Sequence, residues 1–157
     1  MLKVQISRGA ALPFEFILSA QNFCGDNFLA NGEFIGDIKI SGETYNDGLN
    51  IVARGKINCK KIFNCDRCLT EATQNQTLNF DEEINPADII DETLDITELI
   101  KDTLVAGQPI QNLCKADCKG LCPVCGKNLN DGVCNCNRFC VDPRLAPLLN
   151  FKSIEEV

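Results

Sequence analysis

The first eighty residues alternate between apolar and polar side chains with the two-residue period of a β-strand. The alternation is clear in residues 2–6, 14–18, 34–40 and 49–57, and weaker in 72–84. Strict alternation implies strands that have one buried face and one wet face. The tripeptide Asn46-Asp47-Gly48 is typical of a hairpin turn. This part of the chain is therefore predicted to form an antiparallel β-sheet.

The period changes to that of a helix near residue 95. One apolar stripe is formed by Ile96, Leu99, Ile100 and Leu104. Their spacing of i, i+3, i+4 and i+8 places them on one helix face. Asp95 and Glu98 have the spacing of a capping box, and Gly107 with Pro109 ends the segment. The pattern predicts one main helix over 95–106.

The periodic patterns stop after this helix, and cysteines appear among Gly, Pro, Asn and Lys. We therefore expect an α+β fold: an antiparallel β-sheet or partial barrel, one main helix and a small C-terminal cysteine-rich zinc module. The expected regions are a β-rich domain at 1–110, the zinc-binding module at 111–142 and a short tail at 143–157. A chain of 157 residues suits one domain with such an appended module.

Composition removes several classes of enzyme. The chain has 11 cysteines and no histidine. Ser-His-Asp triads, Cys-His pairs and histidine-ligated zinc enzymes are therefore excluded. No other constellation typical of a hydrolase is present, so the sequence predicts a protein that is not an enzyme.

The net charge of −7 is concentrated in one segment. Eight acidic residues and no Lys or Arg lie between Asp81 and Glu98, and the rest of the chain carries +1. Binding to nucleic acid depends on local charge, so the overall acidity does not exclude it. The acidic segment itself is interpreted as a solvated loop that leads into the helix. If it binds a partner, it would imitate RNA toward a basic ribosomal protein.

Neither a signal-peptide core nor a run of about 18 apolar residues is found. We expect a cytoplasmic protein that does not enter a membrane. Thiols stay reduced in that compartment, so clustered cysteines favour metal ligands or redox groups over disulfides.

The strongest chemical signal is a cluster of six cysteines near the C-terminus. They are Cys114, Cys118, Cys122, Cys125, Cys134 and Cys136. Their neighbours are mostly polar, which argues against cysteines packed in a core. Four thiolates complete a structural zinc site, so four of the six close one site, or all six hold two ions that share ligands. An iron–sulfur cluster is the alternative.

A second pair, Cys65 and Cys68, gives a weaker signal. It is compatible with a structural turn, a metal half-site or a redox dithiol. Redox dithiols of the thioredoxin type lie where a strand meets a helix, whereas strands are predicted on both sides of this pair. The structural turn is favoured and a second metal half-site comes next.

Basic residues precede the same pair. Arg54, Lys56 and Lys60 share one strand parity, and Arg67 lies at the cysteine turn. Alternation places the first three opposite the apolar face, so they contact solvent or a partner. They form an ordinary solvated face or a surface that contacts RNA phosphates.

Several of these motifs together resemble the YceD family, the large ribosomal RNA subunit accumulation proteins of bacteria and plastids. The resemblance rests on CDRCL from Cys65, CKGLCPVCGKNLN from Cys118, CNC from Cys134 and DPRL from Asp142. It implies a non-enzymatic factor in 23S ribosomal RNA accumulation and large-subunit biogenesis. The implied partner is ribosomal RNA or a pre-large-subunit particle, with a ribosomal protein as a further possibility.

Two other functions are compatible with the residues alone. One is a thiol-based redox protein that uses Cys65 and Cys68. The other is a zinc-stabilised adaptor for protein interactions. A redox dithiol needs a depressed thiol pKa, which separates the first of these from the second.

Overall fold

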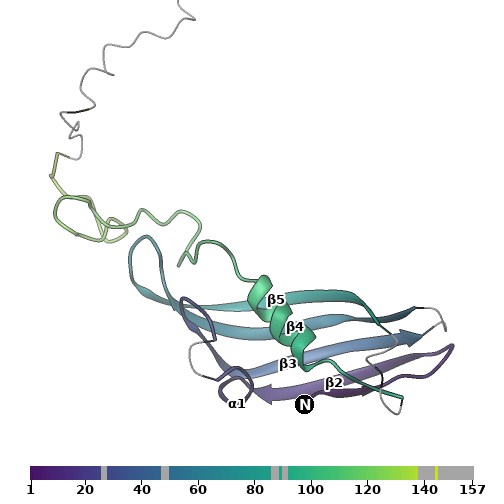
Figure 1. Cartoon of the computed structure of the whole chain (residues 1–157). Coiled ribbons are helices and arrows are strands. Elements are labelled where there is room, and N and C mark those ends of the chain that lie inside the picture. The colour runs from purple at the N-terminus through teal and green to yellow at the C-terminus, as the bar shows by residue number, and fades with distance from the viewer. Residues whose placement is uncertain (26–27, 47–49, 86–88, 90–91, 138–143, 145–157) are drawn as a thin grey trace, which may run out of the picture.

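The computed structural model describes residues 1–25, 28–46, 50–85, 89, 92–137 and 144 (Figure 1). The predicted tail at 143–157 and the DPRL motif therefore lie almost wholly outside the described residues. The elements in chain order are β1 (Lys3–Gln5), β2 (Ala11–Ser19), α1 (Ala20–Cys24), β3 (Glu33–Asn46), β4 (Ile51–Asn64), β5 (Glu71–Ile84), β6 (Thr93–Asp95) and α2 (Thr97–Ala106).

The main sheet confirms the predicted α+β class. Its four strands run antiparallel in the order β2-β3-β4-β5, and the sheet is open. β3 and β4 pair as far as Asn46 and Ile51, which confirms the predicted hairpin, although its tip at 47–49 lies outside the described residues. β4 and β5 pair along their full length, so the weak pattern at 72–84 belongs to a long strand.

One face of the sheet carries the core. The helix α2 lies across this face (Figure 1) and contributes Ile100 and Leu104, preceded by Ile96 at its N-cap, and none of the three is exposed. These three residues belong to the stripe predicted from the sequence. A two-stranded ribbon of β1 and β6 joins the same core through Val4 and Leu94.

The helix begins two residues later than predicted. Asp95 ends β6, and its carboxylate accepts hydrogen bonds from the backbone N–H of Thr97, at 2.9 Å, and from the hydroxyl of Thr97. Glu98 forms an ion pair with Lys101, one turn further on. Ile96 therefore occupies the N-cap position predicted for Asp95, and the predicted capping box is not formed. Asp95 instead binds Thr97 from the residue before the cap, and Glu98 contributes along the helix.

The opposite face of the sheet is polar and exposed. Alternate residues of β4, from Arg54 to Lys60, point to this open face, while Ile57 and Cys59 point into the core. Within the described ranges, no helix has the length and apolar character needed to cross a membrane.

Candidate metal centres

The turn between β4 and β5 presents two thiols at one end of the sheet. The N–H of Leu69 donates to the carbonyl of Cys65 at 2.9 Å, and the N–H of Cys65 donates to the carbonyl of Thr70 at 3.0 Å. Leu69 adopts a positive φ of 57°, which closes the turn tightly. The Sγ atoms of Cys65 and Cys68 are thereby held on the inner side of one loop, and both residues are buried.

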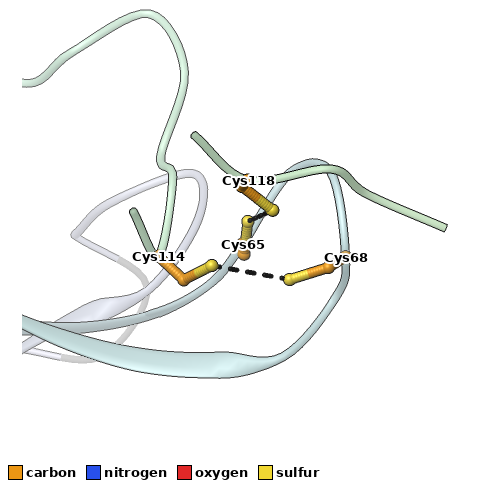
Figure 2. Close-up of side chains that lie close together, drawn as sticks. All are labelled: Cys65, Cys68, Cys114 and Cys118. Carbon is orange, nitrogen blue, oxygen red and sulfur yellow. Dashed lines mark hydrogen bonds between the residues drawn. The ribbon is translucent and has the colours of Figure 1, made fainter. Parts of the chain in front are cut away.

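Cys114 and Cys118 complete this first group of four thiols. Sγ of Cys65 lies 3.8 Å from Sγ of Cys118, and Sγ of Cys68 lies 3.6 Å from Sγ of Cys114 (Figure 2). All four sulfur atoms lie within 4.8 Å of one another. Figure 2 shows the side chains converging from two separate segments of the chain.

A buried lysine positions the segment that carries Cys114. Lys61, on β4, is 1% exposed, and its ammonium donates to Oε1 of Gln108 at 2.9 Å and to Oδ1 of Asn112 at 2.8 Å. Asp66 accepts from the backbone N–H of Asn112 at 2.6 Å. These bonds attach the chain after α2 to the end of β4, so that Cys114 meets the cysteine turn.

Arg67 attaches the next part of that segment. Its Nη1 donates to the carbonyl of Cys118 at 3.1 Å, and its own carbonyl accepts from the N–H of Leu121 at 3.1 Å. Gly120 has φ +73°, and a Cβ there would lie 3.0 Å from the Arg67 carbonyl oxygen. Glycine suits this position for two reasons: its backbone is left-handed, and the Arg67 carbonyl approaches closely where a Cβ atom would lie.

The second group of thiols lies wholly within the C-terminal module. It consists of Cys122, Cys125, Cys134 and Cys136, whose sulfur atoms also lie within 4.8 Å of one another. The N–H of Gly126 donates to the carbonyl of Cys122 at 2.9 Å, and Gly126 has φ +71°. Cys122 is buried, whereas Cys125 is exposed.

The acidity of the thiols differs within each group. Burial opposes ionisation of Cys65, but hydrogen bonds from neighbouring backbone groups and from Cys68 bring its pKa down to about 6. Backbone N–H groups of Cys125 and Val124 likewise lower the pKa of Cys122 to about 6.

Burial and hydrogen bonds with the surrounding thiols raise the pKa of Cys114 to about 12. A hydrogen bond with Cys125, together with burial, raises the pKa of Cys136 to about 12. Adjacent thiolates repel one another, so the four thiols of a group ionise together only around a cation.

The spacing of the sulfur atoms fits a single tetrahedral ion. A Zn–S bond of about 2.3 Å in a tetrahedron separates neighbouring sulfur atoms by about 3.8 Å. In the first group, the Cys65–Cys118 and Cys68–Cys114 sulfur pairs lie at 3.8 and 3.6 Å. Both groups therefore fit a metal bound by four thiolates.

The grouping differs from the arrangement considered from the sequence. There, the six cysteines from Cys114 to Cys136 formed one module, and Cys65 with Cys68 were a turn or a half-site. In the structure the pair forms a turn and also lies against two of the six, so eight of the ten described cysteines fall into two sets of four with no shared member. The Cys-x-x-Cys spacing indicated a half-site, but its partners lie 46 and 53 residues away.

The basic residues predicted to contact RNA have different surroundings. Arg54 is exposed, but its guanidinium forms an ion pair with Glu43 at 2.6 Å and lies opposite Asp81 on β5. Its pKa is raised by the hydrogen bond with Glu43 and by the charges of both acids. Lys56 and Lys60 are exposed on the open face as predicted.

A third lysine on the open face was missed by the sequence analysis. Lys39, on β3, pairs directly with Asn58 of β4, which lies between Lys56 and Lys60 on the same side. We call Lys39, Lys56 and Lys60 the lysine face. Strand alternation places Lys39 on the solvent-facing side of β3. Only the register of β3 with β4 shows that it lies beside Lys56 and Lys60.

The chain is similar to a described protein family. A family model described as "Large ribosomal RNA subunit accumulation protein YceD" matches residues 53–152. This range contains all eight grouped cysteines. No solved structure matches the chain.

Curated relatives come from mycobacteria and a plant. An uncharacterized protein of Mycobacterium tuberculosis is 26% identical over 127 residues, which cover 72% of this chain and 60% of the relative. An uncharacterized protein of Mycobacterium leprae is 28% identical over 94 residues, covering 51% and 43% respectively. The chain is also 37% identical over 59 residues to "Large ribosomal RNA subunit accumulation protein YCED homolog 1, chloroplastic" of Arabidopsis thaliana, covering 38% and 18%.

Proposed function

The chain belongs to the YceD family, and from this premise we propose that it is a non-enzymatic cytoplasmic factor in the accumulation of 23S ribosomal RNA and the biogenesis of the large ribosomal subunit. The observation that carries the proposal is the family match over residues 53–152. The 37% identity with the chloroplastic homologue of Arabidopsis thaliana supports it.

Each group of four cysteines holds one zinc ion in this proposal. Cys65, Cys68, Cys114 and Cys118 would hold the first ion, and Cys122, Cys125, Cys134 and Cys136 the second. A site closed by four thiolates leaves no coordination position for substrate, so the ions supply structural stability rather than catalysis. The first ion would fasten the β-rich region at 1–110 to the module at 111–142.

The lysine face is the proposed RNA-contacting surface. Lys39 pairs across the strands with Asn58, which lies between Lys56 and Lys60, and the residues paired with Lys56, which are Ser41 and Asn79, carry no charge. Lysines on a flat polar sheet suit contacts with phosphates, which depend little on sequence and weaken with salt. Arg54 is left out of this surface because Glu43 already neutralises it. Arg67 contributes mainly to the cysteine turn through its bond to Cys118.

A binding measurement with 23S ribosomal RNA tests the proposal. The triple variant Lys39→Glu, Lys56→Glu, Lys60→Glu is compared with Lys3→Glu, Lys115→Glu, Lys119→Glu, which changes the net charge equally at exposed positions away from the open face. The first variant should lose association with the RNA or its precursor particles, while the second keeps most of it. If both variants keep the same association with the RNA, the assignment of the lysine face as the RNA-contacting surface is wrong. Unchanged 23S ribosomal RNA levels in cells without the protein would contradict the function itself.

A further inference from the structure

An uncovered strand edge borders a groove on the side of the molecule away from the cysteines. β5 is the last strand of the sheet order within the described residues, so the backbone groups of its outer edge have no partner strand. A groove of ≈ 910 Å³ runs between this edge and α2. Residues 78–85 line one wall, and Leu99, Asp102 and Ala106 belong to the other. A hydrogen bond of 3.3 Å between the side chains of Gln108 and Gln76 lies beyond the end of the wall at Leu78.

The walls of the groove combine apolar surface with carboxylates. Cross-strand pairing with Ile57 and Ala53 places Leu78 and Glu82 on the helix side of β5. Asp81 and Glu83 point to the other side. Neither the Arg54–Glu43 ion pair nor the Lys101–Glu98 ion pair involves Glu82, Glu83 or Asp102. An unpaired strand edge is thus accompanied by acidic side chains above and below it.

We propose that this groove binds an extended polypeptide segment rich in lysine and arginine, which adds to β5 as the next strand. Its backbone would pair with the outer edge of β5, as in other cases of strand addition. On the helix side, long basic side chains would lay their methylene stems on Leu78 and Leu99 and reach Glu82 and Asp102 with their charged ends. On the other side, alternate basic residues would meet Asp81 and Glu83. This interaction is separate from the proposed contact of the lysine face with RNA.

The charge of the groove selects this occupant over two others. A second copy of the chain paired edge to edge through β5 would bring the acids at 81–83 of both copies close together, which is unfavourable. RNA phosphates would be repelled by the same carboxylates. A simpler role for the acids is protection of the edge against aggregation, since charged residues commonly guard long exposed strands. That role predicts no specific binding.

A peptide-binding experiment on the full chain, purified without chelator, distinguishes these cases. The probe is a synthetic ten-residue peptide of alternating lysine and valine. Two further peptides of the same sequence carry N-methyl groups on alternate backbone nitrogens, one in each register, which blocks strand pairing but keeps the charge. The double variant Glu82→Lys, Asp102→Lys is compared with Glu15→Lys, Asp37→Lys, whose acids lie on β2 and β3.

The expected result has two parts. The groove variant should weaken peptide binding about tenfold or more, whereas the control variant changes it by about twofold at most. Binding of the unmodified peptide should protect the backbone amides of residues 78–84 from hydrogen exchange. At most one of the two methylated peptides should give the same protection. Equal weakening in both variants, equal protection with all three peptides, or no binding would overturn the proposal. Protection of the same amides by a single-stranded RNA would also overturn it.

Discussion

Sγ of Cys68 lies 3.6 Å from Sγ of Cys114, although 46 residues separate them in the sequence. The first residue belongs to the turn of a long hairpin and the second to the segment that follows α2. The pair, with Cys65 and Cys118, therefore joins the end of the sheet to the C-terminal module. A metal ion at this point would connect two parts of the chain that otherwise meet through a few polar contacts.

Loss of one ligand from the first group should loosen this junction and leave the sheet folded. In Cys68→Ser, residues 64–70 and 113–120 should exchange backbone hydrogens faster, because the remaining ligands bind the ion less tightly. The core amides of β3 and β4 should keep their protection, since the apolar core of the sheet and α2 does not include these cysteines. Cys24→Ser, at a half-buried position outside both groups, is the control. Loss of protection throughout the sheet in Cys68→Ser would contradict this division.

Lys61 should contribute more to stability than its neighbour Lys60. Lys61→Met removes the donor to Gln108 and to the buried side chain of Asn112, and we expect a loss of about 1–3 kcal/mol in the free energy of unfolding. Lys60→Met, on the exposed side of the same strand, should change it by about 0.5 kcal/mol or less. Urea denaturation of the two variants measures the difference. Similar values for both would show that the bonds of Lys61 do not hold the segment after α2.

The stabilising effect of Asp95 should depend on pH. Hydrogen bonds from Thr97 lower the pKa of Asp95 below its ordinary value of 3.8. Because the folded-state pKa is depressed, the contribution is complete well above pH 3.8 and is lost as the pH falls through the folded-state pKa. Asp95→Ala should cost about 1 kcal/mol at pH 7, and the cost should shrink as the pH falls below the ordinary pKa of 3.8. Denaturant unfolding of variant and wild type at matched pH values tests this, and a cost that stays constant with pH would contradict it.

Arg54 should matter less for RNA than the lysine face. Arg54→Ala leaves Glu43 unpaired at the surface but removes no free positive charge, so association with 23S ribosomal RNA should change by about twofold or less. Changing the three lysines to alanine should lower the salt dependence of binding, with a log–log slope reduced by about 2 for single-stranded contacts. Filter binding over a series of salt concentrations measures both. A larger effect of Arg54→Ala would contradict this expectation and would support the RNA-contacting residues predicted from the sequence, which include Arg54.

Sequence periodicity was sufficient for the sheet and the main helix, because one face of each element is buried against a common core. Ile57 and Ile100, for example, show their burial through spacing alone. β6 and α1 were not predicted because their three and five residues are too short for a period to be seen. Both are formed through tertiary contacts, such as the pairing of Val4 with Leu94.

The candidate site was predictable only in part for a similar reason. Cysteine spacing identified Cys122 and Cys125 as members of a metal-type turn, since both lie within one local loop. It did not assign the partners of Cys65, because these depend on how Lys61 and Asp66 hold the segment around Asn112. Lys61 itself was not considered as a buried residue, although its strand parity on β4 is that of the buried Ile57 and Cys59.

The central claim is that the chain holds two ions in two separate groups of four cysteines. Native mass spectrometry of the intact protein gives the identity and the number of bound ions in one measurement. We expect two zinc ions per chain in the wild type and one in the double variant Cys68→Ser, Cys114→Ser. A single ion in the wild type, or two ions retained by the double variant, would contradict the claim.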